Sequence, residues 1–204
     1  PGKQPMTRRD LAADGAALGL IGLAVTAVFW PAALLRGAFF LQDMMVQNYP
    51  FRHLCGLAVR AGQLPTWRPE INCGFPLLAE GQAGVFYPPN LLSYLLLPTH
   101  VGLSLNIILH CWLAGAGTYA LLRAWQARRA GALAGGLAYA LSGYLVVRAM
   151  SPNFTDVCAW LPVSLLGVEL ALVRRRAGWL LGAAAVGALQ FSAGHPQAAV
   201  YSLL

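Results

Sequence analysis

The sequence predicts an all-α integral membrane protein, with about five transmembrane helices and a long outer loop after the first of them. Hydrophobic residues make up 58% of the 204-residue chain and charged residues only 10%, whereas soluble domains carry about 25% charged residues. Several segments are long and free of charge, as helices that cross a bilayer need to be. This composition argues against a soluble domain and against a disordered chain.

Five apolar segments are the expected spans. The first covers residues 15–35 and follows a short cytoplasmic N-terminus, residues 1–14. An outer loop, residues 36–100, separates it from a four-helix transmembrane region at residues 101–204. The spans of that region are expected at residues 101–122, 130–147, 157–173 and 177–204. Because the chain starts without Met and ends inside an apolar run, we expect a fragment of a longer protein, truncated at its C-terminus.

The basic residues predict the orientation of these spans, since cytoplasmic loops are enriched in Lys and Arg. Most of the 14 basic residues flank the predicted spans on one side, namely Lys3, Arg8, Arg9, Arg123, Arg128, Arg129, Arg174, Arg175 and Arg176. We therefore expect a multi-pass protein of the bacterial plasma membrane with a cytoplasmic N-terminus. The net charge of +7 then reflects topology. No basic face interleaved with aromatic residues is visible, so a nucleic-acid partner is not predicted.

The outer loop is far longer than a connection between helices requires, which is typical of functional loops. Its apolar periodicity predicts an interfacial helix at residues 44–61 and a short interfacial segment at residues 90–97. Asp43 precedes the first of these, at the expected membrane surface. A carboxylate at this depth favours a functional role, while Asp is also a good helix N-cap. Both interpretations stay open from the sequence.

Other outer residues give weaker signals. The carboxylates of Asp43, Glu70, Glu80 and Asp156 could bind Mg²⁺ or Mn²⁺, but no metal-binding motif is present and no metal ligand is assigned. Trp67 and Tyr87 suit either an interfacial aromatic belt or stacking on a sugar ring. Cys55 and Cys73 both fall on the outer side, where a disulfide is permitted but not implied.

Several ordered motifs after the first span resemble the bacterial YfhO-type membrane proteins, which are polytopic proteins related to the GT-C glycosyltransferases. The motifs are Asp43-x3-Gln47-x-Tyr49-Pro50-Phe51 and the runs at residues 62–69 (GQLPTWRP), 74–79 (GFPLLA), 86–90 (FYPPN), 138–144 (AYALSGY), 159–162 (AWLP) and 194–197 (GHPQ). They extend over nearly all of the chain beyond the first span.

This resemblance implies a GT-C-like fold and a membrane glycosyltransferase. Such an enzyme takes a sugar from a polyprenyl-phosphate carrier and delivers it to a cell-envelope glycan or lipid at the outer face. Asp43 matches the acidic residue of the first outer loop that is central to GT-C catalysis. It would act as the general base, because an inverting transferase must remove a proton from the acceptor hydroxyl.

Further residues would complete such a site. Arginine stabilises phosphate through paired hydrogen bonds, so Arg52, Arg60 or Arg68 could bind the leaving lipid phosphate or, alternatively, lipid headgroups. His195 and Gln197 either face the same cavity or belong to a proline-kinked helix end. Two other functions stay open: a transporter or flippase, which the intramembrane residues Glu169 and His110 suggest, and a non-catalytic assembly factor of the cell envelope.

Overall fold

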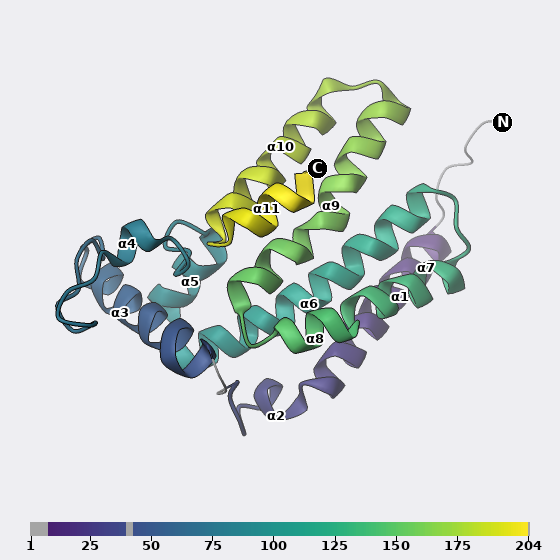
Figure 1. Cartoon of the computed structure of the whole chain (residues 1–204). Coiled ribbons are helices and arrows are strands. Elements are labelled where there is room, and N and C mark those ends of the chain that lie inside the picture. Colours follow the sequence, from purple (N-terminus) through teal and green to yellow (C-terminus); the bar gives the residue numbers. More distant parts are fainter. Residues whose placement is uncertain (1–7, 40–42, 204) are drawn as a thin grey trace.

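The structure, a computed structural model, describes residues 8–39 and 43–203 and confirms the all-α prediction within them. Every regular element in these ranges is a helix, beside one isolated β-bridge between Arg68 and Phe75. Four helical segments, residues 8–28, 99–124, 129–148 and 152–174, have the length and hydropathy to cross a membrane. Figure 1 shows these helices as a tilted bundle, with a group of shorter helices at one end.

Helix α1 (Arg8–Val28) is the first of these segments and begins earlier than the predicted residue 15. It buries Ala17, Ile21 and Val25, which are spaced four residues apart and therefore lie on one face. That face packs against α6 and α7. The short helix α2 (Trp30–Ala33) follows directly, with a proline in its first turn.

Helix α6 (Thr99–Ala124) is the centre of the bundle, and it packs against α1, α7 (Arg129–Ala140) and α9 (Pro152–Arg174). Small residues bring the backbones together, as is common between membrane helices. A Cβ atom on Gly136 would lie 2.8 Å from the backbone oxygen of Gly115, and one on Gly115 would lie 2.6 Å from Ile21. No side chain larger than hydrogen fits at this crossing without movement.

Two of the expected spans are interrupted. Helix α7 stops near Ser142, whose hydroxyl accepts a hydrogen bond from Leu145 N–H and so starts helix α8 (Gly143–Arg148). The expected span at residues 177–204 is divided into α10 (Ala177–Ser192) and α11 (Pro196–Leu203). The division falls at Gly194, which has a φ of +96°, and Pro196 then begins α11 because its fixed φ suits a first helical turn.

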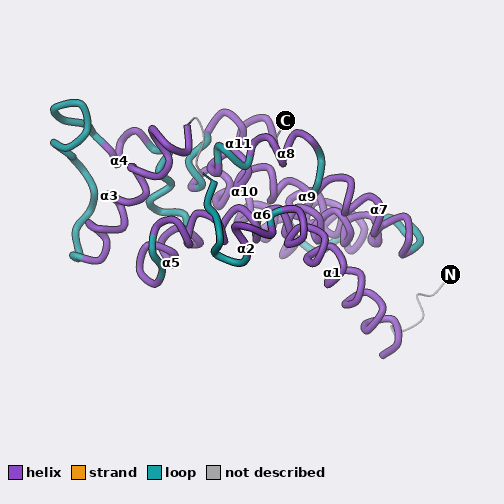
Figure 2. The backbone as a smooth tube through the Cα atoms, turned by 90° about the horizontal axis from the view of Figure 1, so that it is seen from below, coloured by secondary structure: helices purple, strands orange, loops and turns teal. Residues whose placement is uncertain are grey.

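The short helices form what we call the outer unit, residues 43–98. It contains the π-helical turn η1 (Met44–Asn48), α3 (Tyr49–Arg60), α4 (Leu77–Glu80) and α5 (Pro88–Leu96). The helix expected at residues 44–61 is therefore confirmed. The unit has its own apolar core, made by Phe51, Cys55, Leu77, Ala83, Val85 and Tyr94. In Figure 2 it lies at the end of the bundle opposite to the start of α1.

The glycine crossing gives a first prediction. Gly136→Ala should destabilise the protein by about 1–3 kcal/mol, because the added methyl group meets the Gly115 carbonyl in a packed interior. Gly131→Ala is the matched control in the same helix, since nothing lies within 4 Å of its added Cβ; alanine there should be neutral or stabilising. Unfolding of the two purified variants measures both effects. Equal free energies of unfolding for Gly136→Ala and Gly131→Ala would contradict the close approach of α6 and α7 at Gly136.

Candidate functional site

Asp43 lies at the start of the outer unit, directly before η1, and its side chain is exposed. It makes no capping hydrogen bond to the helical segment that follows, so the N-cap role that the sequence left open is not realised. Instead, Asp43 lines a pocket of about 390 Å³. The other lining residues come from α8 and the segment before α9: Gly143, Tyr144, Val147, Arg148, Met150 and Ser151.

Arg148 is the basic residue of this pocket, and no binding role was predicted for it from the sequence. Its guanidinium lies 4.8 Å from the ring centre of Phe154 and 5.9 Å from that of Tyr144. Thr155 Oγ1 donates a hydrogen bond to the backbone oxygen of Arg148 at 2.9 Å. Neighbouring residues of α9 therefore hold both the side chain and the backbone of Arg148. Arg148 follows Tyr144 by four residues, and this helical spacing was the feature of the sequence that could have indicated their contact.

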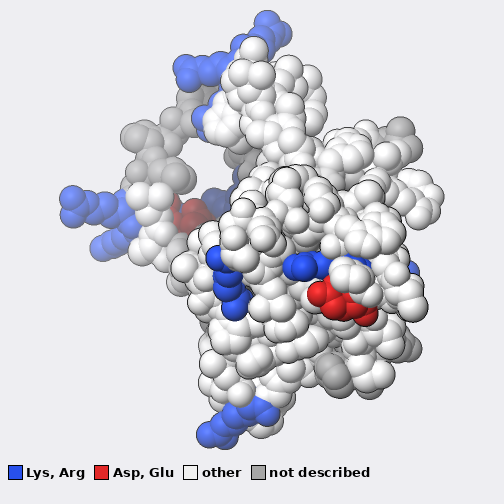
Figure 3. Space-filling view, turned by 90° about the vertical axis from the view of Figure 1, so that its left-hand side faces the viewer, with Lys and Arg blue, Asp and Glu red and all other residues white. Residues whose placement is uncertain are grey.

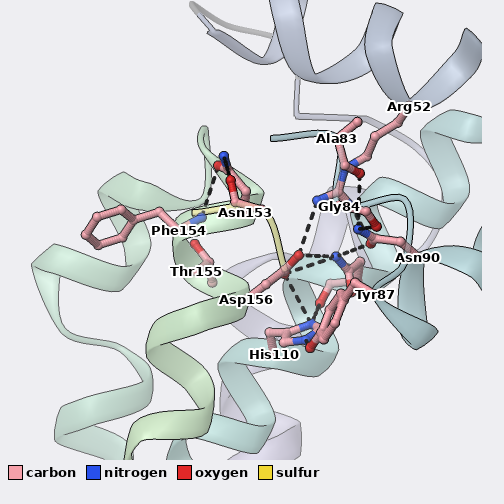
Figure 4. Close-up of polar contacts among 12 residues, drawn as sticks. Arg52, Ala83, Gly84, Tyr87, Asn90, His110, Asn153, Phe154, Thr155 and Asp156 are labelled. Atoms are coloured by element: carbon pink, nitrogen blue, oxygen red, sulfur yellow. Dashed lines mark hydrogen bonds and ion pairs between the residues drawn. The ribbon is translucent and has the colours of Figure 1, made fainter. Parts of the chain in front are cut away.

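A buried ion pair lies beneath the junction of the outer unit and the bundle. Arg52 Nη2 of α3 is 3.2 Å from Asp156 Oδ2 of α9, and the two side chains are 2% and 0% exposed. Arg52 also donates to Asn90 Oδ1 of α5 at 2.8 Å, while Asn106 of α6 donates to both Asp156 oxygens at 3.0 Å. Figure 4 shows the side chains of Arg52, Asn90 and Asp156 converging from separate elements. Neither member of the pair had been assigned this role from the sequence.

His110 extends this network into the bundle. Its Nδ1 is 2.7 Å from the backbone oxygen of Asn106, which can only accept, so Nδ1 carries the proton. Nε2 is then free to accept from the Tyr87 hydroxyl, which in turn accepts from Trp160 Nε1 at 2.6 Å. Burial raises the pKa of Tyr87, and a neutral phenol is the form that donates to His110. The hydrogen bonds therefore run from Trp160 through Tyr87 and His110 to the backbone of Asn106.

The start of α9 ties the two groups together. Phe154 packs on Arg148, Thr155 holds its backbone, and Asp156 pairs with Arg52. Asn153 adds hydrogen bonds of 3.3 Å to Gln82 Oε1 and to a backbone oxygen of the α10–α11 turn. Four consecutive side chains thus connect the wall of the open pocket to the buried network.

The three arginines expected to bind lipid phosphate all bond within the protein. Arg60 donates to the backbone oxygens of Tyr94 and Leu97 at 2.6 and 3.0 Å and so caps the end of α5. Arg68 donates to the backbone oxygen of Leu54 at 2.9 Å. With Arg52 in the buried ion pair, the three hold the outer unit together, and none of them lines the pocket of Asp43.

The two aromatic residues expected to stack on a sugar differ in exposure. Trp67 is 59% exposed and covers Gly74, but it does not line the Asp43 pocket. Tyr87 is 0% exposed. This burial corrects the expected stacking role of Tyr87, because no face of its ring is open to a ligand. Its hydroxyl serves the hydrogen-bond network instead.

His195 and Gln197 lie at the turn into α11. The His195 ring packs edge-on against Phe154, with centroids 4.7 Å apart, and its Nδ1 accepts from Ala198 N–H at 3.1 Å. Partial burial lowers the pKa of His195, which suits this acceptor role. Gln197 donates to the hydroxyl of Tyr201 on the exposed face of α11. His195 is therefore near the Arg148 wall through Phe154, whereas Gln197 belongs to a local contact.

The outer carboxylates and cysteines are dispersed. Within the described part of the chain, no three His, Cys, Asp or Glu side chains form a group that could hold a metal ion. Figure 3, which looks onto the outer unit, shows a mostly uncharged surface with acidic side chains beside basic ones. Cys55 and Cys73 are both free. Cys55 is buried, which raises its pKa to about 12, so its thiol is unreactive at neutral pH.

Comparison with known proteins gives one match. A family model described as "Bacterial membrane protein YfhO" matches residues 85–189. The matched segment contains most of the buried network and Arg148, while Asp43 and Arg52 precede it. No curated protein and no solved structure matches the chain.

The buried pair gives a second prediction. Arg52→Met should cost about 3–5 kcal/mol of stability, because it leaves the Asp156 carboxylate buried without its cation. Adding Asp156→Asn in the same chain should recover part of that loss, since no uncompensated charge then remains.

Arg36→Met is the matched control, because Arg36 is exposed and such surface changes usually stay within about 0.5 kcal/mol. Denaturant unfolding of these three variants and of the wild-type protein in detergent measures the differences. If Arg52→Met and Arg36→Met have the same free energy of unfolding, the ion pair does not stabilise the fold.

Proposed function

The chain belongs to the YfhO family of bacterial membrane proteins, and on that premise we propose that it is a membrane glycosyltransferase. The reaction moves a sugar from a polyprenyl-phosphate carrier to a cell-envelope glycan or lipid at the outer face of the plasma membrane. One observation carries this proposal. Asp43, an exposed carboxylate without a capping bond, lines the same pocket as Arg148, an accessible arginine.

These two groups match the needs of the reaction. The acceptor hydroxyl attacks the anomeric carbon, the bond from that carbon to the phosphate oxygen breaks, and the hydroxyl proton passes to Asp43 as general base. The lipid phosphate leaves with an additional negative charge, which the guanidinium of Arg148 stabilises. Phe154 and Thr155 restrict the position of Arg148, so little ordering is required when the phosphate arrives.

Tyr144 supplies an aromatic surface in the same pocket. Its side chain is 53% exposed, and its ring packs edge-on against Phe154 with centroids 5.5 Å apart. A ring held at one edge and open on a face suits stacking against the apolar face of a sugar. Tyr144 is therefore proposed for the stacking role that the sequence suggested for Trp67 and Tyr87.

The charge distribution supports an outer location for the pocket. Basic residues gather at the ends of helices remote from the outer unit, at the start of α1, between α6 and α7, and between α9 and α10. At that end Arg129 is 2.6 Å from Asp10 and 2.9 Å from Asp14. Under the positive-inside rule this end, with the N-terminus, faces the cytoplasm.

Cysteine labelling tests this orientation. Cys73 is exposed in the outer unit and should react with a membrane-impermeant maleimide on intact cells. In a Cys73→Ser background, Gln126→Cys, at the exposed turn after α6, should react only after the membrane is permeabilised. The reverse pattern would place the pocket on the cytoplasmic side and overturn the proposed topology.

Asp43→Asn in the complete protein tests the chemistry. Removal of a general base should lower the rate of sugar transfer by about 10²- to 10⁴-fold. The substitution should change folding little, because the Asp43 side chain is exposed and makes no capping hydrogen bond. The rate is measured in proteoliposomes supplied with radiolabelled lipid-linked sugar from a membrane extract.

Glu70→Gln is the matched control for this experiment. Glu70 is an exposed carboxylate of the outer unit that does not line the pocket, so its replacement should leave the rate unchanged. Transfer by Asp43→Asn at the wild-type rate would exclude Asp43 as the base.

A further inference from the structure

A second pocket lies at the outer end of α6, on residues other than those around Asp43. It holds about 220 Å³ and sits where the chain after α2 meets the start of α3 and the first turns of α6. Its lining residues are Ala38, Phe39, Tyr49, His100, Leu103 and Ser104. The lining combines apolar and polar side chains, and none of these residues is acidic.

Ser104 contributes a buried hydroxyl to this pocket. The residue is 2% exposed, and its side chain has no hydrogen-bond partner within the described part of the chain. Hydroxyl side chains inside helices commonly bond the carbonyl one turn earlier, as Thr118 does on the same helix. Because Ser104 does not, its hydroxyl is available to a group that enters the pocket.

The start of α6 adds further donors. The N-cap position is Pro98, which provides no side-chain cap, and the Gly102 N–H bonds to the Pro98 oxygen at 2.9 Å. The N–H groups of the preceding residues of the turn have no partner inside the helix. An uncapped N-terminus of a 26-residue helix carries partial positive charge and favours anions.

We propose that this pocket binds a phosphate ester. The imidazole of His100 and the hydroxyl of Ser104, one turn apart on α6, donate to the phosphate oxygens at the positive end of the helix. Phe39 and Leu103 contact the organic part of the ester. Because α6 has the length and hydropathy to cross a membrane, a pocket at the outer end of this helix would lie at the level of lipid headgroups. The proposal is independent of sugar transfer, because it shares no lining residue with the Asp43 pocket.

Native mass spectrometry of the complete protein in nonionic detergent tests the proposal. The probes are dihexanoyl phosphatidylglycerol and glycerol 3-phosphate. Ser104→Ala and His100→Leu should each weaken binding about tenfold, because each removes a hydrogen bond to a charged group. His100→Lys should tighten binding, since it adds a full positive charge; a purely structural role for His100 would not give that gain.

The two probes distinguish the source of the phosphate. Binding of the lipid alone identifies a headgroup site, and equal binding of glycerol 3-phosphate identifies a soluble ester. Thr118→Ala, the removal of a hydroxyl elsewhere on α6, should change neither affinity. The proposal is overturned if neither probe binds, or if Ser104→Ala and His100→Lys both bind as the wild-type protein does. An inactive Asp43→Asn variant that still binds the probe would separate this site from the transfer site.

Discussion

The buried carboxylate of Asp156 is the group on which the arrangement of the outer unit depends. A charge removed from water is very costly unless it is paired and fully hydrogen-bonded. Here the compensation comes from two directions, from Arg52 on α3 and from Asn106 on α6. Asp156 itself lies on α9. The three elements must therefore adopt one relative position, because any other leaves a charge unpaired in the interior.

The same ion pair also connects the two walls of the open pocket. Asp43 leads through η1 directly into α3, the helix that carries Arg52. Arg148 is held from the other side by Phe154 and Thr155, the two residues that precede Asp156 in the chain. The two walls of the pocket are thus attached to α3 and α9, the two helices that the ion pair joins. Asp43 and Arg148 themselves are both exposed.

Much of the architecture could be predicted from the sequence because hydrophobicity alone determines it. Long uncharged runs gave the membrane helices, and the apolar periodicity after Asp43 gave the helical segment at residues 44–60. A proline-kinked helix end at residues 195–197 was one of two interpretations of the sequence, but the complete break at Gly194 was not predicted. The break depends on a tertiary contact: a Cβ there would lie 2.8 Å from the carbonyl oxygens of Gly81 and Gln82. Such a close approach leaves no periodic signal in a local window of sequence.

The candidate site was predicted less completely, for a related reason. Arg52 and Asp156 are 104 positions apart, and nothing local marks them as partners. Sequence position favoured Arg52, Arg60 and Arg68 equally as phosphate ligands and did not single out Arg148. Arg60 and Arg68 donate to backbone oxygens within the outer unit, whereas Arg148 lies on aromatic rings and lines the pocket that contains Asp43. In a chain with so few charges, the contacts that each arginine makes inside the protein decide which one remains able to bind an anion.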